Sequence, residues 1–261
     1  MAGARAALVT GAGTGIGAAV ARRLTGAGAH VAVMGRRPEP IAAVAGEIGG
    51  LECVGDAAEP ADAERAVAAA VGAYGGLDIL VANAGGDGSA AALEVDDAKW
   101  EAVLRSNLTS TFVLCRAALP ALIERSGSIV IVSSVAGLFA IPDDAGYTTS
   151  KHALVGLTRS LARDYGPRGV RVNAVCPAWT RTPAADASMD RLGERRGVDR
   201  EGAYMLSTEH VPLRRPVTAD EVAAACVFLA SPEASAITGA ALPVDGGSSA
   251  VDLSTAAFDD A

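Results

Sequence analysis

A tyrosine and a lysine, Tyr147 and Lys151, lie four positions apart in the run AGYTTSKHALVGLTRSLARDYG. If both belong to one helix, their side chains lie on the same face. An ammonium group beside a phenol favours the phenolate, which lowers the phenol pKa from about 10 and prepares it to exchange a proton near neutral pH. The alternative interpretation is an ordinary surface pair on a helix. The pair therefore indicates proton-transfer chemistry, provided that other elements hold it in a cavity.

The composition describes a globular chain whose partners are small molecules. Half of the 261 residues are hydrophobic, and the net charge is −8, which argues against binding to nucleic acid or to an anionic membrane. The four cysteines are widely spaced inside apolar stretches, so we expect buried thiols in a reducing compartment, and no metal site. Glycines interrupt the uncharged run near the N-terminus too early for a signal peptide, so we expect a cytoplasmic protein.

Short apolar runs alternate with helical patterns along the whole chain. The expected strands are 6–10, 30–34, 51–55, 77–82, 128–133, 170–176 and 241–244, and the expected helices are 16–27, 39–48, 60–74, 97–124, 147–165 and 218–230. The strands are almost continuously apolar, as expected when helices cover both faces of a sheet. Strict alternation predicts an α/β fold with a doubly wound, seven-stranded parallel sheet, and the lack of a linker predicts one domain over 1–261.

A glycine-rich loop follows the first expected strand. Its glycines fit the pattern G-x-x-x-G-x-G through Gly11, Gly15 and Gly17, and a helical pattern starts directly afterwards. Glycines permit a tight turn and a close approach of the backbone, and the free N–H groups at the start of a helix attract a phosphate. The loop therefore predicts a pyrophosphate-binding site beside the first strand.

Together the motifs resemble the short-chain dehydrogenase/reductase family, near bacterial 3-oxoacyl carrier-protein reductases and polyketide ketoreductases. The resemblance extends from about residue 5 to residue 247. It rests on TGAGTGIG at 10–17, DILVANAGG at 78–86, Asn107 in RSNLTSTF, IVIVSSVAG at 129–137, YTTSK at 147–151 and VNAVCPAWTRTP at 172–183. It implies a single Rossmann domain and hydride transfer between a nicotinamide cofactor and a ketone or secondary alcohol.

The resemblance also implies a catalytic set. Tyr147 would give its proton to the carbonyl oxygen during reduction and accept one during oxidation. Lys151 would bind the nicotinamide ribose and lower the tyrosine pKa, and Ser134 would hydrogen-bond the substrate oxygen. Asn107 would interrupt the long helix at 97–124 and hold a water that links Lys151 to solvent.

The end of the second expected strand bears on the choice of cofactor. Relatives that use NAD carry an acid there for the ribose 2′-hydroxyl, whereas this chain has Gly35 followed by Arg36 and Arg37. A guanidinium binds a phosphate well, so we expect NADP(H), with NAD(H) as the alternative. The cofactor-binding residues that the resemblance implies are Gly11, Thr14, Gly15, Ile16, Gly17, Arg36, Asp56, Ala57, Asn83, Ala84, Gly85, Tyr147, Lys151, Pro177, Thr180 and Thr182.

Two segments lie outside the expected alternation. Residues 178–217 are rich in arginine and are expected to form a substrate lid, with the alternative of a packing insert. Five side chains of this segment are expected to form an apolar pocket with a cationic rim: Trp179, Arg181, Met189, Tyr204 and Met205. The C-terminal tail, 248–261, extends past the usual family ending and is expected to reach a neighbouring subunit.

Two alternatives to a reductase remain at this stage. The chain could be a non-catalytic member of the family that senses nucleotide, although a sensor would not need a proton-transfer set. A Rossmann-like methyltransferase would not explain the tyrosine and lysine. The resemblance further implies a homotetramer, in which the helices around 97–124 and 147–165 form four-helix contacts between subunits.

Overall fold

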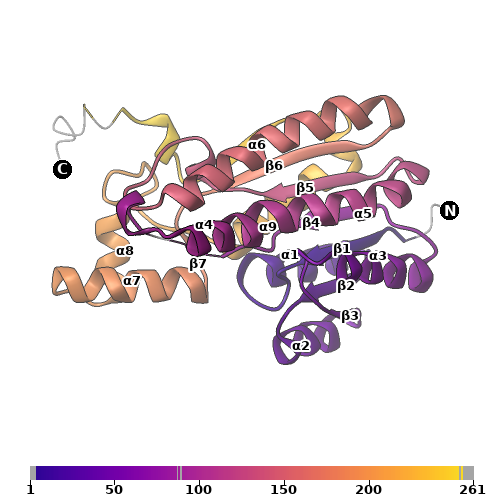
Figure 1. The fold of residues 1–261 in the computed structure, drawn as a ribbon, viewed down its shortest axis with the longest axis horizontal. Helices are drawn as coiled ribbons and strands as arrows, with labels where there is room; N and C mark the ends of the chain where they lie inside the picture. Colours follow the sequence, from indigo (N-terminus) through magenta and orange to yellow (C-terminus); the bar gives the residue numbers. More distant parts are fainter. Residues whose placement is uncertain (1–3, 87, 89, 253, 255–261) are drawn as a thin grey trace.

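The fold is an α/β domain built on one parallel sheet (Figure 1). A computed structural model describes residues 4–86, 88, 90–252 and 254. The sheet has the strand order β3-β2-β1-β4-β5-β6-β9. Its strands are β1 (Ala6–Thr10), β2 (His30–Gly35), β3 (Leu51–Val54), β4 (Ile79–Ala82), β5 (Ser128–Val132), β6 (Arg171–Pro177) and β9 (Ala241–Val244), all paired in parallel. The expected seven-stranded parallel sheet is therefore confirmed.

Helices cover both faces of the sheet. One face packs against α3 (Pro60–Tyr74), α5 (Ser110–Glu124) and α6 (Ala145–Tyr165), and the other against α1 (Gly15–Gly26), α2 (Pro38–Ile48) and α9 (Ala219–Ala230). Strands β1, β4 and β5 are buried at every position, which explains why their sequences do not alternate between apolar and polar residues. Thr218 and Glu221 form a capping box at the start of α9, so the sequence itself sets where that helix begins.

The strand order places a crevice beside the glycine-rich loop. From β1 the chain moves outward through β2 and β3, and it then returns to the other side of β1 with β4. Loops that leave β1 and β4 therefore diverge at the carboxyl ends of these strands, where doubly wound sheets bind their ligands.

The long helical segment at 97–124 is divided by a π-helical turn. It consists of α4 (Asp97–Leu104), the π turn Arg105–Thr109, and α5. By length and composition alone, Asp97–Glu124 could cross a membrane, but half of its most apolar window is buried inside the fold. Packing against α3 and α6 accounts for this apolar character. Residue Asn107 was expected to interrupt the helix, and it lies at the centre of the π turn.

The expected lid forms a separate helical pair at one end of the sheet (Figure 1). Two short strands, β7 (Thr180–Arg181) and β8 (Val217–Thr218), pair in parallel and enclose α7 (Pro183–Arg196) and α8 (Arg200–Thr208). Met189, Ala203 and Tyr204 form a small core between the two helices. Residues 253 and 255–261 of the predicted subunit-contact tail lie outside the described part of the chain.

Candidate active site

The glycine-rich loop has the backbone geometry of an anion cradle. Gly11 and Gly15 have φ angles of +60° and +54°, which side chains disfavour. A β-carbon on Gly17 would lie 2.4 Å from the backbone oxygen of Gly11, so this position packs against the loop itself. Helix α1 follows from Thr14 with no acidic residue in its first turn. Its N-terminal N–H groups and dipole therefore favour a negatively charged ligand such as the expected pyrophosphate.

Thr10 ties this loop to the end of β4. Its hydroxyl oxygen accepts hydrogen bonds from the backbone nitrogens of Asn83 and Ala84, each at 3.1 Å. The Asn83 amide in turn donates to the backbone oxygens of Thr10, at 3.0 Å, and Gly11, at 3.3 Å. No role was predicted for Thr10, although its position directly before Gly11 was a signal. It holds the glycine-rich loop and the end of β4 in register.

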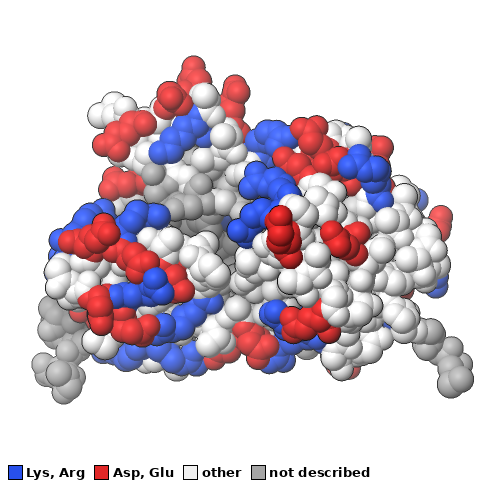
Figure 2. All heavy atoms as spheres, turned by 90° about the horizontal axis from the view of Figure 1, so that it is seen from below, with Lys and Arg blue, Asp and Glu red and all other residues white. Residues whose placement is uncertain are grey.

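One large cavity joins these segments. Its volume is about 1680 Å³, more than the roughly 300–1,000 Å³ typical of a pocket for a single small ligand. Every proposed catalytic or cofactor-binding residue except Gly17 lines it. Figure 2 shows the molecule from below, with a hollow between the side of α7 and α8 and the side of α2, and basic side chains along its rim. The cavity thus offers room for a dinucleotide together with a second molecule.

The end of the cavity where adenosine is expected to bind lies at the ends of β2 and β3. Arg36 and Arg37 line it from β2, and Asp56 and Ala57 line it after β3. Partial burial on its own raises the pKa of Asp56, but the backbone N–H of Ala58 and the neighbouring guanidinium groups lower it below its usual range. Asp56 is therefore an ionised acceptor at neutral pH, as a bond from an adenine amino group requires.

Ser134, Tyr147 and Lys151 line the same cavity. The Lys151 Nζ lies 5.3 Å from the centre of the Tyr147 ring, on the same face of α6. The Ser134 hydroxyl accepts from the backbone nitrogen of Ala136 at 3.1 Å and donates to the Pro177 oxygen at 3.4 Å. Neighbouring Ser133 is buried, and its hydroxyl instead donates to the backbone oxygen of Lys151 at 2.9 Å.

Lys151 is a buried ammonium group. Only 4% of its surface is exposed, and its Nζ donates to the backbone oxygen of Val132 at 3.1 Å. Burial lowers the pKa of Lys151 from 10.5 to about 8, because the interior disfavours the charged form. A lysine that titrates near neutral pH is well suited to a site where protons move.

The π turn directs the Asn107 side chain towards the loop after β4. Its amide nitrogen donates to the backbone oxygens of Gly86 and Val103, both at 3.0 Å, and its oxygen accepts from the Gly86 nitrogen at 3.3 Å. A β-carbon on Gly85 would lie 2.7 Å from the Asn107 oxygen and 3.6 Å from the Lys151 Nζ. Asn107 and Lys151 therefore flank the same glycine, and the side-chain amide fixes the shape of that wall.

The segment after β6 also lines the cavity. Thr180 donates its hydroxyl to the Ala178 oxygen at 2.9 Å, and Thr182 caps α7 by accepting from the Ala185 nitrogen at 3.2 Å. The Thr182 methyl carbon lies 3.0 Å from where a β-carbon on Gly15 would be. The lid therefore begins directly against the glycine-rich loop.

The structure corrects three of the five residues expected in the substrate pocket. Trp179 and Met189 line the cavity, as expected. Arg181 instead pairs with Glu201, and its guanidinium lies 4.5 Å from the centre of the Tyr204 ring. Tyr204 itself is buried between the lid helices. Met205 is exposed and does not line the cavity. The reason is that α8 turns its Tyr204 side towards α7. The apolar walls that the sequence analysis missed are Ile141, Leu206 and Val251.

Comparisons with known proteins cover nearly the whole chain. Residues 11–249 match the family model described as enoyl-(acyl carrier protein) reductase. The chain is 45% identical to Protein MoaE of Klebsiella aerogenes, over 98% of this chain and 99% of that protein. It superimposes on actinorhodin polyketide ketoreductase, solved with NADPH, with a TM-score of 0.89 and 37% identity, covering 94% of this chain and 97% of that one. For 3-ketoacyl-(acyl-carrier-protein) reductase from Brucella melitensis, solved with NADH, the TM-score is 0.84, with 32% identity and coverage of 94% and 98%.

Proposed function

Because the chain belongs to the short-chain dehydrogenase/reductase family, we propose that it transfers a hydride between NADP(H) and a ketone or secondary alcohol, with Tyr147 as general acid and base. The observation that carries the proposal is the convergence of Ser134, Tyr147 and Lys151 on the cavity that also contains the glycine-rich loop. The bound nicotinamide supplies or accepts the hydride, and the protein supplies orientation and the proton.

Each side chain has a distinct task in reduction. The Tyr147 hydroxyl donates its proton to the carbonyl oxygen as negative charge develops there. The Ser134 hydroxyl donates a hydrogen bond to the same oxygen and stabilises that charge. The Lys151 ammonium lies beside the phenol and favours its ionised form after the proton has left. In oxidation the same groups act in reverse.

Arg36 supports the choice of NADP(H). It lines the cavity directly after Gly35, and no carboxylate occupies the end of β2 to repel a 2′-phosphate. NAD(H) is the alternative. The substrate end has apolar walls, among them Trp179, Ile141 and Leu206, which favour a ketone with a hydrocarbon body. We also propose a cytoplasmic homotetramer, whose assembly light scattering on the purified protein would measure.

Replacing Tyr147 by phenylalanine tests the catalytic assignment. The matched control is Tyr165→Phe, which changes the other end of the same helix, α6. We expect Tyr147→Phe to lower kcat for ketone reduction by a factor on the order of 10²–10⁴, the size of a lost general acid, and to leave NADPH affinity nearly unchanged. A ketone panel with NADPH measures turnover, and calorimetry measures binding.

The same measurements separate the alternatives. Full activity in Tyr147→Phe would show that another group supplies the proton. A wild-type protein that binds NADPH tightly but reduces no ketone in the panel would favour a nucleotide sensor.

A further inference from the structure

Arg105 joins two carboxylates at the adenosine end of the cavity. This residue starts the π turn, lines the cavity, and has no role in the catalytic set described above. One of its guanidinium nitrogens lies 2.9 Å from Asp56 Oδ2, and the other donates to Glu59 Oε1. The partners are 49 and 46 positions away in the sequence, so the contact connects the helical layer with the end of β3.

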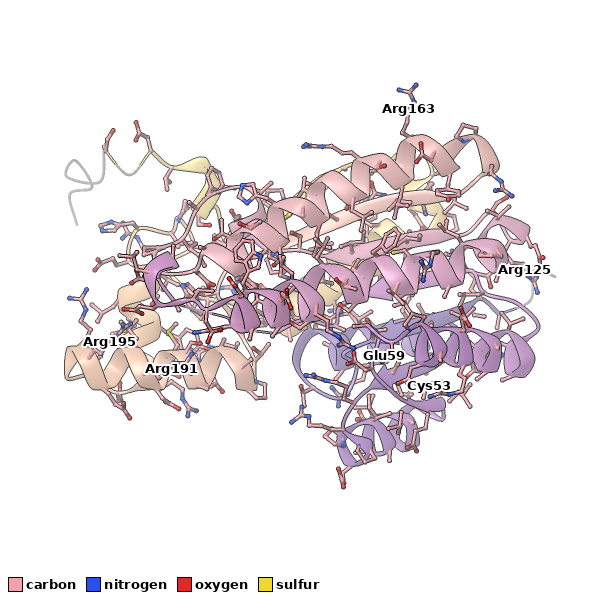
Figure 3. The ribbon with its side chains drawn as sticks, viewed as in Figure 1. Cys53, Glu59, Arg125, Arg163, Arg191 and Arg195 are labelled. Atoms are coloured by element: carbon pink, nitrogen blue, oxygen red, sulfur yellow. The ribbon has the colours of Figure 1, made fainter. Side chains whose placement is uncertain are left out.

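The two acids have few other partners. Asp56 Oδ1 accepts from the backbone nitrogen of Ala58 at 3.0 Å. Among the described residues, Arg105 is the one cation in direct contact with either carboxylate, and Arg36 acts on Asp56 through space. Glu59 directly precedes α3, and Figure 3 labels it near the start of that helix. Asp56 lines the cavity, and Glu59 shares its Arg105 partner without lining the cavity itself. Without Arg105, both carboxylates at this end would therefore lack a bonded counter-ion.

A structural role alone does not account for this arrangement. The side chains of Arg105 and Glu59 are 43% and 57% exposed, and ion pairs at such positions contribute little to folding. Their location matters more, because Asp56, Arg36 and Arg105 line the same part of the cavity. An added negative group on the ligand would interact with all of these charges.

We propose that Arg105 is a cofactor-specificity residue: by neutralising Asp56 and Glu59, it allows the adenosine end of the cavity to accept the additional phosphate of NADPH. This proposal rests on the proposed function, because it assumes that the cavity binds a nicotinamide dinucleotide. It concerns the difference between NADPH and NADH, which differ here by one phosphate group. Arg36 would bind the phosphate, and Arg105 would remove the repulsion that opposes it.

The test is the substitution Arg105→Met, which keeps a long side chain and removes the charge. The control is Arg163→Met, which removes the same charge from an exposed position of α6 far from the cavity (Figure 3). Calorimetry measures the Kd of NADPH and of NADH for each protein at low salt and at high salt. One uncompensated carboxylate facing a dianion across roughly a nanometre of water weakens binding by about fourfold. We therefore expect the NADPH/NADH affinity ratio to fall at least fourfold in Arg105→Met only.

Two further measurements distinguish charge from geometry. Glu59→Gln removes one of the two exposed charges, so in the Arg105→Met background it should restore part of the NADPH/NADH ratio. High salt screens charges at this separation, so the difference between Arg105→Met and wild type should shrink in 0.5 M salt.

Two results would overturn the Arg105 proposal, and only the second of them also contradicts the proposed function. If wild type binds both cofactors and Arg105→Met weakens them equally, Arg105 only shapes the site, and the proposed function stands. If wild type binds neither cofactor, both the Arg105 proposal and the proposed function fail.

Discussion

Lys151 should destabilise the protein at neutral pH, because folding buries its ammonium group. Burial lowers its pKa from 10.5 to about 8, so the unfolded chain holds this proton more tightly than the folded chain does. A difference of about 2.5 pH units corresponds to a cost of roughly 3 kcal/mol while the group is protonated in both states. This cost is fully present below pH 8, and it disappears as the pH rises above 10.5, where the lysine is neutral in both states.

The sign of the effect follows from proton counting. Between pH 8 and pH 10.5 the unfolded chain binds more protons at this residue than the folded chain, so the free energy of unfolding rises with pH. Integrated from pH 7 to pH 10, the contribution of this one residue amounts to about 2.5 kcal/mol. Lys151→Met keeps an unbranched side chain in the same space, and it has no charge to bury. It also leaves the Val132 oxygen without its bond from Nζ, a loss that does not depend on pH.

Urea unfolding without cofactor measures this contribution. The comparison is Tyr147→Phe against Tyr147→Phe/Lys151→Met, because the phenylalanine removes the one phenol whose titration would couple to the lysine. Both proteins also carry Cys176→Ala, because the Cys176 thiol interacts with Lys151. The remaining ionisable groups are shared, so their effects cancel in the difference. We expect the difference in unfolding free energy to shift by about 2.5 kcal/mol in favour of the lysine protein between pH 7 and pH 10. If the difference in unfolding free energy between the two proteins does not change between pH 7 and pH 10, burial does not depress the lysine pKa.

Two other predictions concern glycines. Gly17→Ala places a β-carbon 2.4 Å from a backbone oxygen of its own loop. We therefore expect this variant to lose about 1–3 kcal/mol of stability in thermal unfolding and to bind NADPH more weakly. The control is Gly46→Ala, whose β-carbon would have no neighbour within 4 Å and which should stabilise α2 slightly. Gly35→Asp with Arg36→Ala should shift the NADPH/NADH affinity ratio at least tenfold towards NADH, because it replaces a cation by an anion. The β-carbon added at position 35 lies 2.9 Å from the flexible end of the Ile41 side chain, so we expect the variant to fold. Binding isotherms of NADPH and NADH then measure the affinity ratio.

Local patterns were sufficient to predict the sheet. Strands β1, β4 and β5 lie in apolar runs bounded by polar or glycine residues, and burial on both faces makes such runs continuous. The candidate site was predictable for a related reason. Parallel strands place their carboxyl ends at one edge, so Gly11, Asn83 and Ser134, which follow three different strands, were expected to meet there.

The lid was not predictable in the same way. The residues at 178–217 have no long strand to fix their orientation, and the direction of α8 is set by contacts with α7 instead. Tyr204 bonds Asp186 and packs between the helices, whereas Leu206, two positions later, reaches the cavity. Arg105 was missed because its partners lie 46 and 49 positions away, beyond the reach of any local pattern.

The unfavourable local features of this fold point to the cavity as a site that performs a task. Three local features cost free energy of folding. They are the left-handed backbone at Gly11 and Gly15, the π turn around Asn107, and the buried ammonium of Lys151. All three features face the same cavity, and they come from three separate parts of the chain. Stability alone would favour replacing each of them, so their convergence on one cavity supports the proposed function, in which they hold a phosphate, shape a wall and place a positive charge beside Tyr147.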